Sequence, residues 1–300
     1  MGSVLKRGRY VLVAVVAALL VVSCAFNKFA YNQADTLAAW QADDYFDLDG
    51  AQKEDFQKRF ERLFVWHRHE QLPDYAQFMR TARARMEKGT SREDVLWFID
   101  GLRSRVRNAS RQAAPEAAAL LATLTPAQIE NLQRKFEKDN RKYVKERKIG
   151  GTVDERHEAE SKRIIKQVED WLSPLNNEQE QRIKALAREL PQIEQLRYSE
   201  RLRRQKELLE VLAHRGEDRQ RFTARLTDWM VNWERNRSAD FQKQLDASWV
   251  KRADLLVAVD RMLTPDQRTA SLQRIQGYAN DFTQLASQGR GESGRTTAAR

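Results

Sequence analysis

Apolar side chains recur every three to four residues through most of this 300-residue chain, and few breakers interrupt them. Phe56, Phe60 and Phe64 share one face of an early segment, and Leu226 and Trp229 share one face of a late segment. This spacing is the period of an amphipathic helix. The whole chain contains only six prolines and twelve glycines, and we find no stretch with the alternation of a strand. The sequence therefore predicts an all-α fold, a multi-helix bundle.

Four short stretches share one pattern, in which a leucine is followed by a capping residue and, four positions after the leucine, by a glutamine. They are 48–52, 124–128, 175–179 and 263–267. An Asp, Asn or Thr in the second place accepts a hydrogen bond from the first-turn amides, and the glutamine reaches back to its backbone. Each stretch therefore predicts the start of a helix.

The spacing of these starts suggests an internal duplication. The first and third lie 127 residues apart, and the second and fourth lie 139 apart. We expect two related helical halves, 48–150 and 151–286, joined at Gly150-Gly151; chance similarity between two arginine-rich stretches is the alternative. The tail 287–300 lacks apolar anchors, which predicts disorder.

The N-terminus has the layout of an export signal. Three basic residues precede an apolar run at 10–22, which is shorter than the roughly 20 residues of a membrane-spanning helix. Cys24, the only cysteine, follows directly after Ser23. Val21-Val22-Ser23-Cys24 resembles the lipobox of bacterial lipoproteins. The resemblance implies that the signal peptide 1–23 is removed and that acyl chains, palmitate among them, are attached to Cys24.

The residue after the cysteine is Ala25, which resembles the outer-membrane sorting pattern more than inner-membrane retention. An uncleaved anchor with an incidental cysteine is the alternative for the N-terminus. Residues 24–47 would form a membrane-proximal segment whose aromatic side chains either pack on the body or rest at the lipid headgroups.

Beyond the lipobox, the chain resembles a family of uncharacterised lipoproteins of Gram-negative bacteria over nearly its whole length. The matching stretches are Tyr31-Asn32, Trp40, 44–48, 66–73, 139–142 and Trp171-Leu172. The four helix starts also resemble the Leu-Thr-x-x-Gln motif of small periplasmic stress chaperones of the Spy and CpxP type. The first resemblance implies a lipid-anchored helical protein, and the second implies an affinity for client proteins.

The charge balance limits the partners. The first 23 residues hold three of the 53 basic residues and none of the 43 acidic ones, so the remaining chain has a net charge of +7. After export, nucleic acid is excluded as a partner. We expect the membrane as one partner, through Cys24, and envelope proteins or anionic envelope polymers as others. The sequence leaves the oligomeric state open.

Tryptophan and arginine residues near the C-terminal end form the candidate ligand-binding or client-binding site. Trp229 and Trp233 lie four residues apart, in step with two arginines, and a further arginine-rich run lies at 197–206. An aromatic and basic groove there would bind a peptide or glycan, although such a stripe is more often core with arginine stems along it. The basic members of the candidate site are Arg201, Arg204, Arg225 and Arg237.

Two further clusters favour structural roles. His67 and His69 are two residues apart and point to different faces of a helix, so we expect a helix-surface or helix-end position and no metal site. Asp43, Asp44 and Asp49 crowd a helix boundary, where negative charge ahead of a helix N-terminus explains them. We find no catalytic motif, so we expect no catalytic residues and no cofactor.

These observations combine into one functional expectation. The chain is a periplasm-facing lipoprotein of the outer membrane, less favourably of the inner membrane, with a non-catalytic binding or scaffolding role. Chaperone-like binding of envelope clients is the first version. A structural lipoprotein that contacts peptidoglycan or lipopolysaccharide through basic helix faces is the alternative, and an enzyme ranks third.

Overall fold

The computed structural model describes residues 31–172 and 174–297. All regular secondary structure in these two ranges is helical, which confirms the all-α, multi-helix prediction. The helices are α3 (Ala34–Phe46), α4 (Gly50–Trp66), the π-helix η1 (His67–Gln71), α5 (Leu72–Met86), α6 (Arg92–Leu121), α7 (Pro126–Arg147), α8 (Val153–Trp171), α9 (Asn177–Arg188), α10 (Glu194–Ala213), α11 (Arg219–Val231), α12 (Ala239–Arg261) and α13 (Pro265–Thr297).

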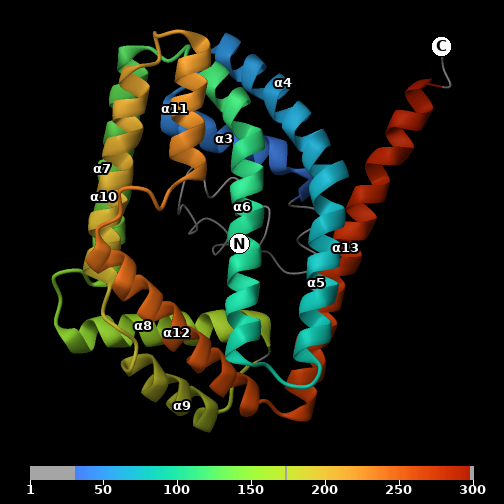
Figure 1. Cartoon of the computed structure of the whole chain (residues 1–300), viewed down its shortest axis with the longest axis vertical. Helices are drawn as coiled ribbons and strands as arrows, with labels where there is room; N and C mark the ends of the chain where they lie inside the picture. Colours follow the sequence, from blue (N-terminus) through green and yellow to red (C-terminus); the bar gives the residue numbers. More distant parts are fainter. Residues whose placement is uncertain (1–30, 173, 298–300) are drawn as a thin grey trace.

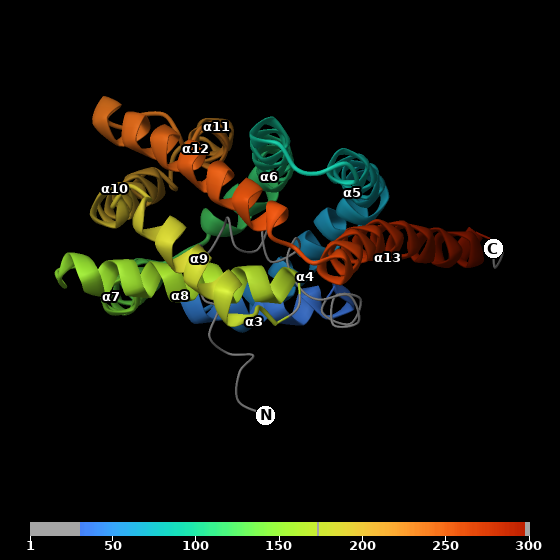
Figure 2. The same ribbon diagram turned by 90° about the horizontal axis from the view of Figure 1, so that it is seen from below.

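The helices pack mainly in pairs that are distant in sequence (Figure 1). Helix α13 runs along α5, α11 lies beside α6, and α10 lies beside α7. Helices α8, α9 and α12 close one end of the molecule, and α12 reaches back to α6 (Figure 2). The fold therefore depends on contacts between segments that lie from 65 to about 200 positions apart in the sequence.

Helices α4, η1 and α5 form one continuous, bent rod. The backbone N–H of Leu72 bonds to the carbonyl of His67, five residues earlier, so the ladder widens by one residue in this turn. Pro73 follows at once, and its ring has no N–H to continue the ordinary ladder. The Leu72-Pro73 step thus follows a π turn inside a continuous rod. The second such step, at Leu190-Pro191, does lie in a connection between helices.

The four predicted helix starts are confirmed. Asp49, Thr125, Asn176 and Thr264 each accept a hydrogen bond from the backbone N–H three residues on, over 2.8 to 3.3 Å. The glutamine side chain at that position accepts a bond from the backbone N–H of the capping residue in all four cases. Two of the first-turn donors of each helix are thereby satisfied.

The glutamines of the first two motifs also bind each other. Nε2 of Gln52 donates to Oε1 of Gln128, and Nε2 of Gln128 donates back to Oε1 of Gln52, over 3.2 and 2.5 Å. Each amide also donates to the carbonyl that precedes the other motif: Gln52 to Thr123 and Gln128 to Asp47. Reciprocal hydrogen bonds of the two side-chain amides therefore join the N-termini of α4 and α7.

The third and fourth motifs repeat this arrangement. Gln179 and Gln267 exchange side-chain bonds of 2.8 and 3.1 Å. Gln179 donates to the carbonyl of Met262, and Gln267 donates to that of Pro174, the residues that precede the partner motif in each case. The four motifs thus form two pairs with the same hydrogen-bond pattern.

The two predicted halves nevertheless share their main cores. The largest cluster packs Leu132 of the predicted half 48–150 against Leu212, Phe222 and Leu226 of the predicted half 151–286. Another cluster packs α5 against α13, with Tyr75 beside Phe282. Two smaller clusters lie within 151–286 alone: one of α8, α9 and the end of α12, and one that packs Ile193 against Phe241 and Leu245. The two predicted halves are therefore interlocked.

The two ends of the chain bear on the remaining predictions. Residues 1–30, with the signal peptide and Cys24, lie outside the described residues. Within the described ranges, no helix combines the length and apolarity that a membrane span requires. At the other end, α13 continues to Thr297, past the point where we expected regular structure to stop, and Ala286 is its last described buried side chain.

Candidate functional site

Trp229 of α11 and Arg204 of α10 form a close structural pair. The Arg204 guanidinium lies 4.3 Å from the centre of the Trp229 ring. Nη2 of Arg204 donates to the carbonyl of Trp229, and Nε1 of Trp229 donates to the carbonyl of Arg204, over 2.5 and 3.2 Å. Burial lowers the pKa of Arg204, and the neighbouring Glu207 opposes this shift. The pair therefore ties α10 to α11.

Trp233 is covered by an arginine that sequence reasoning did not single out. Arg107 of α6 stacks 4.7 Å from the centre of the Trp233 ring. It also donates to the carbonyl of Val231 and pairs with Glu234, both over 3.2 Å. Trp229 and Trp233 thus each have an internal arginine partner, as the core interpretation of this stripe predicts.

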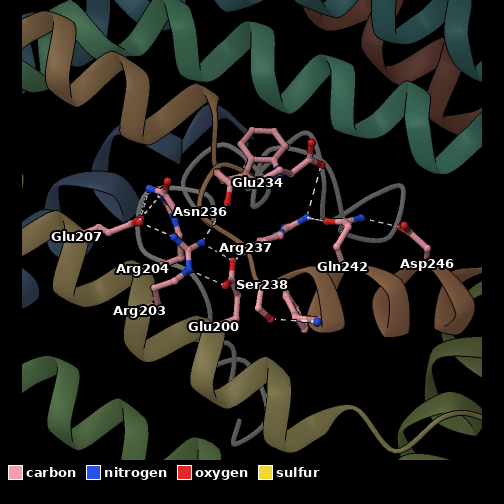
Figure 3. A network of polar contacts seen from close by, with 12 residues as sticks. Glu200, Arg203, Arg204, Glu207, Glu234, Asn236, Arg237, Ser238, Gln242 and Asp246 are labelled. Atoms are coloured by element: carbon pink, nitrogen blue, oxygen red, sulfur yellow. Dashed lines mark hydrogen bonds and ion pairs between the residues drawn. The ribbon is translucent and has the colours of Figure 1, made fainter.

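The arginines around these tryptophans belong to an ion-pair network (Figure 3). Glu200 accepts hydrogen bonds from Arg203 and Arg237, which join α10 to the connection before α12. Glu207 binds Arg203, Arg204 and Asn236. The Glu200 hydrogen bond is the main reason that the pKa of Arg203 is raised. With Arg107 and Glu234 included, four arginines face three glutamates, so most of the positive charge of the network is paired internally.

The other two predicted arginines lie apart from this network. Arg201 donates to Oδ1 of Asn140 over 2.6 Å and lies 5.6 Å from the ring centre of Tyr143, both on α7. Arg225 is half exposed and pairs with Glu217 at 3.3 Å. The structure therefore brings four of the six predicted site residues together, and uses their charges internally.

An exposed basic stripe on α7 is the strongest external charge feature that we find. Its members recur at alternating steps of four and three residues, which keeps them on one face of a helix. They are Arg134, Lys138, Arg141 and Lys145 of α7 and Lys148, the capping residue directly after it, and all five are exposed. Lys148 lies 14 positions after Arg134, so the stripe is about 21 Å long.

Few acidic groups neutralise this stripe. The two arginines have loose partners one turn earlier, Glu130 at 4.0 Å and Glu137 at 3.9 Å. Lys138, Lys145 and Lys148 form no ion pair with any carboxylate of the described residues. The last members lie at the C-terminal end of α7, where the helix dipole favours positive charge. Sequence reasoning missed this stripe, although its spacing was a readable signal.

His67 lies at a helix end, directly after α4, but inside the molecule, so the expectation of a surface position was wrong. It begins the π-helix and is 3 % exposed. The Tyr31 hydroxyl lies 3.1 Å from Nδ1, and the Tyr75 ring lies edge-on at 5.4 Å. Burial lowers the pKa of His67 to about 4. Nε2 of His67 and the hydroxyl of Tyr75 have no hydrogen-bond partner among the described residues.

The acidic cluster at the first helix boundary is used in local contacts. Asp43 pairs with Lys53 at 3.0 Å and accepts a bond from the backbone N–H of Leu48. Asp44 pairs with Lys135 of α7, and Asp49 caps α4. Among the described residues, no group of three or more His, Cys, Asp and Glu side chains is placed to hold a metal ion.

Residues 44–242 match the model of a family of unknown function, DUF6279. The chain belongs to this family. No curated protein and no solved structure matches it. The DUF6279 region contains the first three capping motifs, the π-helix, the arginine network and the α7 stripe, whereas the fourth motif lies beyond it.

Proposed function

We propose that this DUF6279 protein is a lipoprotein anchored through Cys24 to the periplasmic side of the outer membrane, with a non-catalytic binding and scaffolding role. Of its two versions, we favour contact with an anionic envelope polymer, peptidoglycan or lipopolysaccharide. The observation that carries this choice is the exposed basic stripe of α7.

The stripe suits a polymer with repeated negative charges. A single exposed ion pair contributes little in salt, but five cations in a row act together on a chain of anions. The helix beneath them is held in place, because Asn140 bonds to Gln205 and Tyr143 bonds to Glu194 of α10. A preformed row loses little conformational freedom when the polymer binds.

A pulldown tests the polymer proposal. Residues 25–300, which retain every described residue, are mixed with purified peptidoglycan sacculi in one arm and lipopolysaccharide in the other. We expect co-sedimentation at low salt in at least one arm, lost at about 0.5 M salt, where the screening length is only about 4 Å. The double substitution Lys138→Glu and Lys145→Glu should abolish it.

Matched lysines on other helices serve as the control. Lys166 of α8 and Lys206 of α10 are exposed and pair loosely with Asp170 and Glu210. Changing both to Glu alters the net charge equally, and binding should persist. Equal loss with both double variants would leave only a general charge effect and contradict a role for the stripe.

Chaperone-like binding is the second candidate, and exposed apolar side chains favour it. Val65, Val153 and Leu256 lie exposed on α4, α8 and α12, where unfolded clients would meet them. Equimolar protein should suppress light scattering by an aggregating client, and changing these three residues to Ser should weaken the effect. Unchanged scattering with the wild-type protein would remove this candidate.

The anchor is tested separately. Mass spectrometry of the native protein should find Cys24 as an acylated N-terminal residue, and Cys24→Ser should release the protein from membranes. An unmodified N-terminus on a protein that is free in the cytosol would contradict the proposed location.

A further inference from the structure

Helix α3 presents an unusual outer surface for so charged a chain. Charged residues make up 32 % of the sequence, yet only one of the four exposed residues of α3, Asp35, is charged. The others are Thr36, Leu37 and Trp40. Leu37 and Trp40 are 55 % and 59 % exposed and lie one turn apart on the same side of the helix.

The opposite side of α3 is firmly attached to the body. Ala34 and Ala38 pack against Phe60 of α4. At the far end, the Tyr45 hydroxyl donates to Asp139 of α7, and burial is the main cause that raises the pKa of Tyr45. The exposed apolar residues therefore sit on a docked helix.

The chain before α3 is also attached. Tyr31 is buried, with its ring 4.6 Å from that of Phe64 and its hydroxyl next to His67. Tyr31 lies seven positions after Cys24, and a fully extended chain of that length spans at most about 25 Å. If acyl chains hold Cys24 in a bilayer, Tyr31, three positions before the start of α3, lies within that distance of the lipid.

We propose that the outer row of α3, with Leu37 and Trp40 at its centre, lies in the headgroup layer of the membrane that holds Cys24. This inference rests on the lipid anchor of the proposed function. Tryptophan prefers the membrane interface, because its ring is apolar and its N–H finds polar partners there. The row adds little desolvation cost, because Asp43 and Asp44 are paired with lysines and Asp35, two positions before Leu37, lies on another side of the helix. This contact between α3 and the membrane determines which side of the protein faces the periplasm.

Quenching of tryptophan fluorescence by brominated lipid tests the contact between α3 and the membrane. The full acylated protein is reconstituted into phosphatidylethanolamine and phosphatidylglycerol vesicles whose acyl chains carry bromine. We expect quenching of tryptophan fluorescence, and Trp40→Phe should remove most of it. Trp249→Phe, on α12, should leave it unchanged. Equal quenching in the wild type and in Trp40→Phe would overturn the proposal.

A second pair of variants distinguishes the membrane contact of α3 from the acyl anchor on Cys24. Leu37→Asp should reduce quenching, whereas Val153→Asp, at a similarly exposed position on α8, should not. Both should still float with vesicles, because the acyl chains remain. Protein that fails to float would refute the anchor. In a third outcome the protein floats, but Trp40 is neither quenched by the lipid nor accessible to acrylamide. The outer row of α3 would then be covered by protein, which would overturn the membrane contact of α3 and leave the anchor in place.

Discussion

At the residue scale, His67 links the stability of the fold to pH. Its pKa is about 4 in the folded protein and 6.5 in the unfolded chain, so the unfolded chain binds the proton more readily. The free energy of unfolding should therefore be unaffected above pH 6.5 and should fall as the pH drops towards 4, by about 3 kcal/mol in total.

Variants with a neutral side chain at this position distinguish the contribution of His67 to the pH dependence of stability from that of the carboxylates. Urea unfolding of His67→Gln should show a smaller loss of stability between pH 7.5 and pH 4 than the wild type shows. His69→Gln, two residues away and less buried, should match the wild type. Equal losses in all three proteins would mean that His67 is hydrated and free to titrate.

At the element scale, the reciprocal glutamine pairs join helix starts to each other. Gln179 and Gln267 are both buried, so removing one side chain leaves the amide of the other partly unsatisfied. Each single change to Ala should cost about 1–3 kcal/mol. The double variant should cost less than the sum of the two, because no orphaned amide remains.

Urea unfolding of the four proteins in this cycle measures the coupling. Gln133→Ala, at an exposed position of α7, should have little effect and serves as the control. Additive costs within experimental error would show that each glutamine acts only in its own cap.

At the scale of the whole molecule, the shared cores predict one cooperative unit. Leu212 and Leu226, in the predicted half 151–286, are fully buried in a cluster shared with the half 48–150. Residues 31–150 alone would therefore expose the apolar side chains that pack against them. We expect this fragment to melt without a sharp transition in circular dichroism, and a cooperative transition to return when residues 151–300 are added. A sharp melt of the isolated fragment would contradict the interlocked arrangement.

The candidate site was only partly predictable for a related reason. Trp229, Trp233 and Arg237 were chosen from their spacing and Arg204 from a separate arginine-rich run, and the four do lie together. The stacking partner of Trp233, Arg107, comes from α6, and the counter-ion of Arg237, Glu200, comes from α10, so spacing could not reveal these contacts. The α7 stripe was readable, but its exposure depends on what packs against α7.

The amino-acid sequence by itself determined the helices and their starts, because the apolar period and the bonds from Asp49 to Gln52 or from Asn176 to Gln179 involve residues at most four positions apart. Only the tertiary structure decided that Gln52 meets Gln128 and that α5 meets α13. It also decided that His67 is buried while Trp40 is not. Those outcomes depend on contacts between segments that are distant in sequence, and amphipathic helices of similar pattern have no local preference among possible partners.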